Sequence, residues 1–227
     1  MLLDLLFPRR CLGCGRWGRY FCQDCLKEIY PFENQICPVC EKNSLGGLTH
    51  PGCQTKYSLD GLVSIFPYEG VMRQAIVKLK YRFITDLTKE LMDLAETVLK
   101  KKKEVPKFDR SWVLIPVPLH SRRQRWRGFN QAEVFGRMLV EKFGWQFRTD
   151  ILGRQRHTQP QVRLRIKERK KNIRGVFRIN PHSQFVIPDS KFIIFDDIWT
   201  TGATMRECGQ LLKKIGTREV WGLTLAR

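Results

Sequence analysis

The sequence lacks two features that define whole classes of protein. No apolar run reaches the roughly 18 residues that a membrane-spanning helix needs, so no membrane span is expected. The opening residues, MLLDLLF, form only a short apolar stretch that Asp4 interrupts and that no basic region precedes, which argues against a secretory signal. We therefore expect a cytoplasmic protein, in which thiols stay reduced.

Acidic residues are also scarce. The 227 residues include 22 Asp and Glu against 41 Lys and Arg, which gives a net charge of +19. Such an excess indicates a polyanionic partner: nucleic acid, a phosphorylated small molecule or an anionic membrane surface. Hydrophobic residues make up 42% and aromatic residues 11%, enough for a packed core, so wholesale disorder is excluded.

Cysteine, by contrast, is concentrated at one end: seven of the eight cysteines lie within residues 11–53. They form three CxxC pairs and one HxxC pair, and two intervening residues allow a tight turn to present both side chains to one tetrahedral metal ion. Disulfides suit a secreted chain, and a redox CxxC would be single, so two zinc sites are favoured. Because protein fills all four positions, both zinc ions are expected to be structural. In sequence order the ligands are Cys11, Cys14, Cys22 and Cys25, then Cys37, Cys40, His50 and Cys53, although a cross-braced pairing stays open.

The composition changes after Cys53, which predicts a zinc module over residues 1–56 and a second domain over residues 57–227. In the second domain, hydrophobic spacing predicts helices over 71–81, 87–103, 130–143 and 204–215. Apolar runs predict strands over 62–68, 112–117, 192–195 and 220–225. Strands that alternate with helices indicate an α/β fold with a mostly parallel sheet flanked by helices.

The most informative segment is FIIFDDIWTTGAT, residues 192–204. A buried strand is followed by two acids and then by a small-residue turn that opens a helix. Ligands of open α/β sheets bind at the carboxyl ends of strands, and a helix N-terminus favours a phosphate. Asp196 and Asp197 provide acceptors for the vicinal hydroxyls of a sugar. The segment therefore predicts a site for a ribose 5-phosphate.

This segment resembles the 5-phosphoribosyl-1-pyrophosphate (PRPP) signature of type I phosphoribosyltransferases. The resemblance implies the type I phosphoribosyltransferase fold, PRPP bound with Mg²⁺, and Asp196 and Asp197 as the catalytic pair on the ribose hydroxyls. Purine-salvage relatives carry an acidic candidate base where this chain has Thr200, so no general base is implied. The loop implied to hold the 5-phosphate is Thr200, Thr201, Gly202, Ala203 and Thr204.

A second stretch, IPVPLH followed by SRRQRWRGFNQ (residues 115–131), resembles the ComF branch of that family, as does the spacing of residues 154–177. ComF proteins are competence-associated, with a small zinc module ahead of a phosphoribosyltransferase domain, and are linked to handling incoming single-stranded DNA. The resemblance allows other DNA-uptake proteins as partners. It implies a pyrophosphate loop at Val117, Pro118, Leu119 and His120, with Arg122 and Arg123 nearby.

Two basic stretches exceed what PRPP requires. Arginine beside exposed aromatic rings is typical of a single-stranded nucleic-acid track, where bases stack and phosphates meet guanidinium groups. The alternative is an active-site loop that closes over pyrophosphate, together with a solubilising face. The candidate nucleic-acid residues are Arg125, Trp126, Arg127, Arg163, Arg165, Lys167, Arg169, Lys170 and Lys171.

Three functions are compatible with these patterns. The first is a factor that binds PRPP and single-stranded DNA and serves DNA uptake in natural transformation. The second is a metabolic phosphoribosyltransferase that transfers ribose 5-phosphate to an unidentified acceptor. The third is a non-catalytic, zinc-dependent adaptor. No acceptor-base pocket is recognisable in the sequence, which weakens the second.

Overall fold

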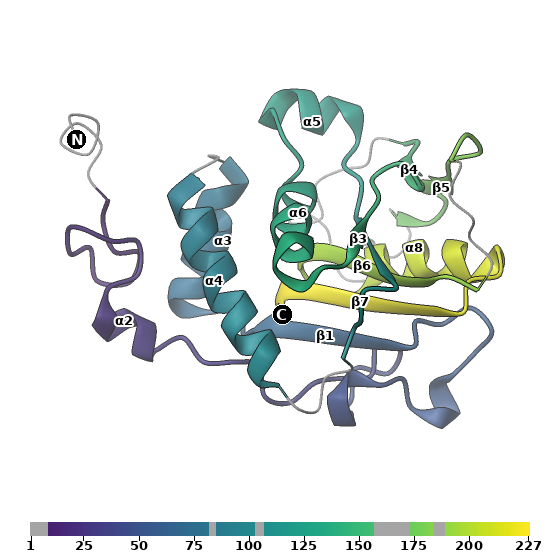
Figure 1. The fold of residues 1–227 in the computed structure, drawn as a ribbon, viewed down its shortest axis with the longest axis horizontal. Coiled ribbons are helices and arrows are strands. Elements are labelled where there is room, and N and C mark those ends of the chain that lie inside the picture. The colour runs from purple at the N-terminus through teal and green to yellow at the C-terminus, as the bar shows by residue number, and fades with distance from the viewer. Residues whose placement is uncertain (1–8, 82–84, 103–106, 157–172, 184–188) are drawn as a thin grey trace.

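A computed structural model describes residues 9–81, 85–102, 107–156, 173–183 and 189–227 (Figure 1). Its centre is a five-stranded sheet of order β1-β7-β6-β2-β3, in which every neighbouring pair is parallel. The first two strands in sequence are buried along their whole length, which explains why they read as continuous apolar runs. The strands are β1 (Gly61–Phe66), β2 (Trp112–Pro116), β3 (Gln146–Phe147), β6 (Lys191–Ile198) and β7 (Glu219–Ala226).

Helices cover both faces of this sheet. Successive side chains of a strand point to opposite faces, so β6 divides its apolar residues between two clusters. Ile193 and Phe195 pack with the helices α3, α4 and α6, whereas Phe192 and Ile194 pack with α8. The helices are α3 (Gly70–Tyr81), α4 (Thr85–Lys101), α6 (Gln131–Phe143) and α8 (Ala203–Lys214).

Two smaller elements lie over the α8 side. The strands β4 (Leu152–Arg154) and β5 (Phe177–Ile179) form an antiparallel pair, and residues of both join the core cluster that contains α8. The short helix α5 (Ser121–Arg127) follows β2 and stands apart from the sheet at the top of Figure 1.

The N-terminal module packs against the sheet domain in two places. Its first half, with helix α2 (Gln23–Lys27), lies beside α3 and α4, and Phe21 is buried in their cluster (Figure 1). Its second half, with the 3-10 turns Leu45–Gly47 and Pro51–Cys53, runs along β1. There the side chain of Gln35 donates to the carbonyl of Ser64 and accepts from its backbone N–H. The domain boundary at residue 56 stays a prediction.

The mostly parallel sheet with flanking helices that the sequence predicts is confirmed. One expected strand, 192–195, extends to Ile198, because its pairing with β7 continues as far as Ala226. The acid pair therefore lies inside the strand rather than after it. Sequence periodicity did not predict α5 or the short strands β3, β4 and β5. Among the described residues, no helix combines the length and apolar character needed to span a membrane.

Candidate functional site

The predicted phosphate segment, Thr200–Thr204, spans the end of the loop between β6 and α8 and the first two residues of α8. The chain leaves the sheet at Trp199, whose backbone N–H donates to the carbonyl of Ala226 at 2.9 Å. Gly202 has a φ of 65°, in the left-handed region that favours glycine. A Cβ at Gly202 would lie 2.1 Å from a ring carbon of Trp199. Glycine is therefore required there both by the backbone conformation and by the close approach of the indole.

Two observations make this loop suitable for an anion. The N-cap of α8 has no side-chain hydrogen bond, and the first N–H groups of a helix have no partner within it. The helix dipole adds a favourable field for negative charge. Thr201 is 8% exposed as a residue, and its Oγ1 has no hydrogen-bond partner among the described residues. A buried hydroxyl without a partner costs about 1–3 kcal/mol, which a phosphate oxygen accepting from it would offset.

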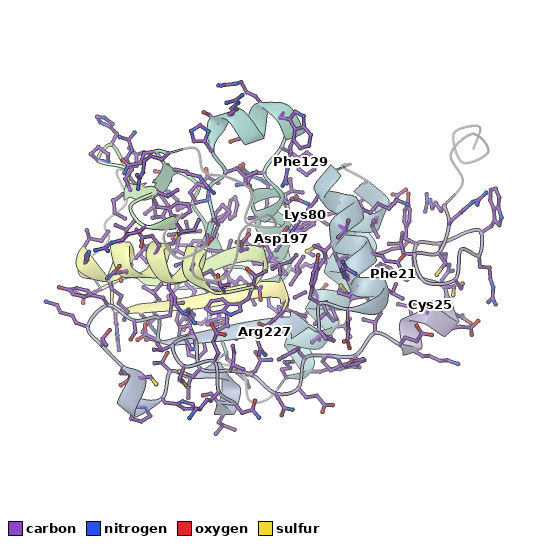
Figure 2. The ribbon with its side chains drawn as sticks, turned by 180° about the vertical axis from the view of Figure 1, so that it is seen from behind. Phe21, Cys25, Lys80, Phe129, Asp197 and Arg227 are labelled. Atoms are coloured by element: carbon purple, nitrogen blue, oxygen red, sulfur yellow. The ribbon has the colours of Figure 1, made fainter. Side chains whose placement is uncertain are left out.

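The two acids occupy the end of β6 and point to opposite faces of the sheet, because strand side chains alternate. Asp197 faces α3, where its carboxylate lies 3.2 Å from Nζ of Lys80 (Figure 2). Asp196 faces α8, and its Oδ1 accepts from the backbone N–H of Asp197 at 2.9 Å.

The electrostatic state of the acid pair is unusual. Burial, and secondly the negative charge of Asp197, raise the pKa of Asp196 to about 7. The N–H group of Asp197 and the positive charges of Lys80 and Arg154 act in the opposite direction without overcoming burial. Near neutral pH a group that hydrogen-bonds to Asp196 therefore meets a carboxyl poised between its two protonation states.

The predicted pyrophosphate loop, Val117–His120, lies next to the acid pair. The backbone N–H of Val117 donates to the carbonyl of Phe195 at 2.8 Å. The carbonyl of Val117 accepts from the buried amide of Asn130 at 3.1 Å, which fixes the start of the loop. His120 ends the loop as the N-cap of α5 and accepts from the N–H of Arg122. Strand pairing between β2 and β6 thus brings two of the predicted ligand-binding segments to one edge of the sheet.

The basic residues of α5 do not all share one environment. Arg122, Arg125 and Trp126 are exposed, and 71% of the Trp126 side chain is accessible. Arg127 is half-buried and donates to Oε1 of Gln131 at 3.1 Å, a side-chain contact that Arg122 and Arg125 lack among the described residues. The other candidates lie outside the described residues, namely Arg163, Arg165, Lys167, Arg169, Lys170 and Lys171.

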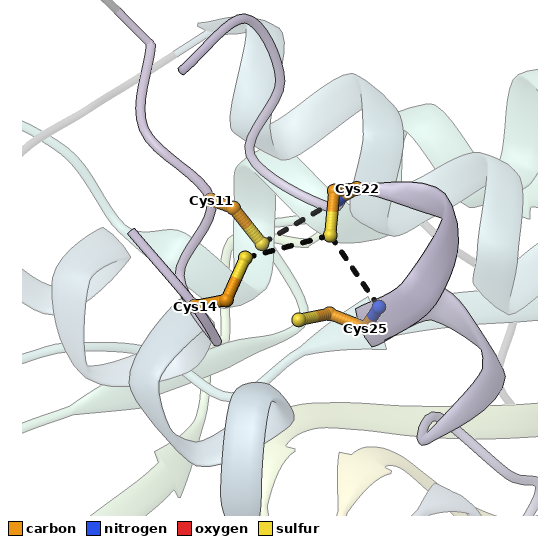
Figure 3. Close-up of side chains that lie close together, drawn as sticks. All are labelled: Cys11, Cys14, Cys22 and Cys25. Atoms are coloured by element: carbon orange, nitrogen blue, oxygen red, sulfur yellow. Dashed lines mark hydrogen bonds between the residues drawn. The ribbon is translucent and has the colours of Figure 1, made fainter. Parts of the chain in front are cut away.

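The first cysteine cluster converges on one point (Figure 3). The sulfurs of Cys11, Cys14, Cys22 and Cys25 all lie within 4.8 Å of one another. Burial alone would raise the pKa of Cys11, but backbone N–H groups of Cys14, Cys22 and Gly13 lower it to about 6. A sulfur that readily becomes a thiolate and a tetrahedral set of four soft donors both suit zinc.

The second cluster comprises Cys37, Cys40, His50 and Cys53, whose ligand atoms also lie within 4.8 Å of one another. The partners of the two ring nitrogens show how the His50 ring is oriented. Its Nε2 lies 3.0 Å from the carbonyl oxygen of Asn43, which can only accept, so Nε2 carries the proton. In a neutral imidazole Nδ1 is then the nitrogen left to bind a metal, and it lies 3.3 Å from the sulfur of Cys40, as a metal ligand held by an outer hydrogen bond would. The chain thus groups its ligands sequentially rather than cross-braced.

Comparisons with known proteins agree with this arrangement. Residues 2–54 match the family described as double zinc ribbon domain. "Competence protein F" of Haemophilus influenzae is 28% identical over 90% of this chain and 96% of that protein. "DNA utilization protein YhgH" of Salmonella typhi is 28% identical over 93% and 92%, and "Competence protein ComFC" of Streptococcus pneumoniae is 28% identical over 91% and 87%.

Over most of its length the chain is therefore similar to proteins named competence protein F and ComFC. Its N-terminal module is a double zinc ribbon with two four-residue ligand clusters. Among solved structures, an allosteric regulatory enzyme of purine biosynthesis matches 66% of this chain but only 30% of its own, with 15% identity and a TM-score of 0.40. Adenine phosphoribosyltransferase from Leishmania tarentolae matches 63% of this chain and 71% of its own, with 14% identity and a TM-score of 0.35.

Three residues at the candidate site were not predicted from the sequence. Lys80 pairs with Asp197, Asn130 holds the carbonyl of Val117, and Arg206 donates to the carbonyl of Thr201 at 2.9 Å. Asn130 carried a signal, because it stands as an N-cap before a helical pattern. Lys80 and Arg206 had no such sequence signal. Each is one of several basic residues on its helix, and only the packing decides which of them contacts the site.

Proposed function

We propose that this chain binds PRPP with Mg²⁺ at the end of β6, binds single-stranded DNA on a basic surface, and acts in DNA uptake. The PRPP part is supported above all by one observation: at the N-terminus of α8, shortly after the two acids in sequence, the buried Thr201 hydroxyl has no hydrogen-bond partner among the described residues. These donors suit a phosphate, and these acceptors suit the hydroxyls of the attached sugar.

Each segment has a separate task in this proposal. Thr200–Thr204 hold the 5-phosphate through backbone N–H groups and hydroxyls. Asp196 and Asp197 accept hydrogen bonds from the ribose hydroxyls, and their negative charge stabilises positive charge that develops on the sugar. Val117–His120 border the same edge and receive the pyrophosphate. Mg²⁺, when bound with PRPP, would neutralise part of the pyrophosphate charge. The oxygen atoms of pyrophosphate and of the carboxylates are ligands that suit Mg²⁺.

The DNA-binding part rests on different residues. The exposed indole of Trp126 stands on α5 between arginines, and base stacking on an aromatic ring combined with guanidinium contacts to phosphates is the pattern of single-strand binding. Relatives are named as DNA utilization and competence proteins, which favours a role in DNA uptake over a purely metabolic one.

Zinc in both clusters completes the proposal. The first cluster offers four sulfurs and the second three sulfurs with one imidazole, and protein fills all four positions in each. Such sites leave no position for substrate, so each zinc serves folding rather than catalysis. In a module with little core of its own, metal binding is a main source of folding free energy.

Calorimetric titration of PRPP with Mg²⁺ tests the site. The double variant Asp196→Asn with Asp197→Asn should lose binding while its fold is retained. A matched control is Glu28→Gln with Glu141→Gln, which removes two exposed acids elsewhere and should bind PRPP as the wild type does. Unchanged affinity in the aspartate variant would refute the assignment.

Release of pyrophosphate from PRPP, measured with and without single-stranded DNA, separates the three candidate functions. Release that depends on DNA supports a factor that processes DNA. Release that is independent of DNA and accelerated by a small nucleophile supports a metabolic transferase. Binding of PRPP without release in either condition supports an adaptor that retains the pocket.

A further inference from the structure

One guanidinium joins the second zinc ribbon to the phosphate loop. Arg206 lies in the first turn of α8, and its Nη1 donates to the carbonyl of Thr201 at 2.9 Å. Its Nε donates to the carbonyl of Pro38, and its Nη2 donates to Oε1 of Glu41 at 2.6 Å. Pro38 lies between two metal ligands and Glu41 follows the second of them, so these last two contacts both lie at the Cys37–Cys40 turn.

The zinc-ribbon side of this contact is rigid. The N–H of Glu41 donates to the carbonyl of Cys37 at 2.9 Å, which closes the turn around the metal ligands. Glu41 has a φ of 62°, a conformation that costs a non-glycine residue about 1–2 kcal/mol. Adjacent Ile36 is 2% exposed and belongs to the core cluster that contains Trp199. The turn and the start of the phosphate loop thus share one core cluster, and Arg206 contacts both directly.

The chemistry requires arginine. Three donors in a fixed planar fork reach three acceptors at once, and a lysine ammonium cannot reproduce this arrangement. The ion pair with Glu41 alone would contribute little, because the Glu41 side chain is 44% exposed. The two backbone carbonyls are the informative partners, since each belongs to a turn whose shape determines whether a ligand binds.

We propose that Arg206 is a positioning residue that couples metal binding at Cys37, Cys40, His50 and Cys53 to ligand binding at the phosphate loop. PRPP should tighten the second metal site, and metal at that site should tighten PRPP binding by the same factor, because coupling between two binding equilibria is reciprocal. The ligand part of this statement rests on the proposed PRPP site. The coupling of the two turns does not, because it is argued from the contacts of Arg206 alone.

Two variants and a control test it. Arg206→Gln removes the fork, and Arg206→Lys keeps the charge without it. Arg218→Gln is the control. It removes one exposed arginine just before β7, at the amino end of the strand and so away from the phosphate loop. Amide hydrogen exchange of residues 199–205 reports on the loop. Alkylation of Cys37 and Cys40, followed by mass spectrometry, reports on the second metal site, and Cys11 and Cys14 serve as an internal reference in the same sample.

Both Arg206 variants should speed amide exchange in the loop and alkylation of Cys37 and Cys40 by about 5- to 20-fold, a usual range for coupled sites. The alkylation rates of Cys11 and Cys14 should stay unchanged. PRPP should slow alkylation of Cys37 and Cys40 in the wild type but not in the variants. Unchanged loop exchange together with unchanged alkylation at the second site would overturn the proposal, even if thermal stability falls. A wild type that does not bind PRPP contradicts the proposed function, while exchange and alkylation still decide the coupling.

If the Arg206 variants fail to fold, Glu41→Gly decides the question. Glycine suits the positive φ at this position, so the turn is retained while one of the three contacts is lost. A smaller change of about 2- to 5-fold in the same two measurements is expected. Identical exchange and alkylation in Glu41→Gly and the wild type would count against the coupling.

Discussion

The ammonium of Lys80 lies 3.2 Å from a carboxylate oxygen of Asp197 and joins the last turn of α3 to the end of β6. The two side chains are 24% and 14% exposed, so water screens this pair less than an ordinary surface ion pair. Lys80 also lowers the pKa of the neighbouring Asp196, against the larger effect of burial. A single lysine thus offsets part of the repulsion between two adjacent acids.

Removal of this lysine should destabilise the protein most where both acids are ionised. We expect Lys80→Gln to lower the free energy of unfolding by about 1–3 kcal/mol at pH 8, because Asp197 loses a charged hydrogen-bond partner. The loss should be smaller at pH 5, where Asp196 is protonated. Thermal unfolding at both pH values measures this, with Lys89→Gln as an exposed control on α4. Equal losses at both pH values would contradict the electrostatic explanation.

Asp196 makes a distinct contribution to pH dependence. Its pKa is raised to about 7 in the folded chain, against about 3.9 when unfolded. Between about pH 4 and pH 7 the folded state therefore holds a proton that the unfolded state has lost, so stability falls as the pH rises through this window. Asp196→Asn should remove this fall in stability. It should raise the free energy of unfolding at pH 8 by about 1–2 kcal/mol, which corresponds to about 2–8 °C in Tm. A gain of the same size at pH 5 would indicate altered packing instead.

Gly202 provides a test of the loop that leaves every charge in place. We expect Gly202→Ala to abolish PRPP binding, because the new methyl group collides with the Trp199 ring and forces the loop to move. The positive φ adds a backbone cost of about 1 kcal/mol. Calorimetry measures the loss of PRPP binding and thermal unfolding measures the loss of stability, so the two effects are separated on the same sample. Gly216→Ala also has a positive φ but meets nothing nearby, so it controls for backbone strain alone.

His50 decides the number of metal ions. Elemental analysis of the wild type should give two zinc ions per chain. His50→Ala should give one zinc ion per chain, because the second site loses a ligand and binds zinc too weakly to retain it. His50→Cys should restore two, because a thiolate can replace an imidazole in a tetrahedral zinc site. Cys208→Ala is the matched control, since Cys208 is fully buried in the sheet domain outside both clusters. Two zinc ions in His50→Ala would exclude His50 as a ligand.

How far the sequence predicts this structure depends on how local each signal is. The apolar run of β2 and the periodicity of α6 depend on nearby residues and were predicted within a few positions. The sequence SRRQRWR has no apolar periodicity, so α5 was not foreseen. That helix is held by an unusual histidine N-cap and by Gly128, whose φ of 80° ends it.

Long-range contacts set the second limit. The acid pair and the phosphate loop form one continuous segment and could be read together. Lys80 lies more than 100 residues before Asp197, and Pro38 lies 168 residues before Arg206. Neither pairing has a local pattern, because each arises only when parallel strands and the zinc ribbon are packed together. The sequence also placed the acids after the strand, since only pairing with β7 shows that β6 continues to Ile198.

The exposed face of α5 gives the sharpest test of DNA binding. If Z phosphates are neutralised, the logarithm of the binding constant for single strands should fall with the logarithm of salt concentration at a slope of about −0.7Z. Arg122→Gln with Arg125→Gln should flatten the slope by about 1.4 if both arginines contact phosphates. Replacing Lys167, Lys170 and Lys171 together by Gln should flatten it by about 2 if all three do.

Trp126→Ala should act differently. Loss of base stacking should weaken binding by about 1–3 kcal/mol, and the salt slope should stay unchanged because no charge is removed. Its indole is already 71% exposed, so the fold has little to lose from the substitution, and thermal unfolding should confirm this. Fluorescence anisotropy of a labelled oligonucleotide between 50 and 200 mM salt measures both quantities. A wild type that retains no oligonucleotide at low salt excludes DNA binding by this chain. Binding that neither the arginine nor the tryptophan changes affect would place the DNA away from α5, because charge and stacking would then both be supplied by other residues.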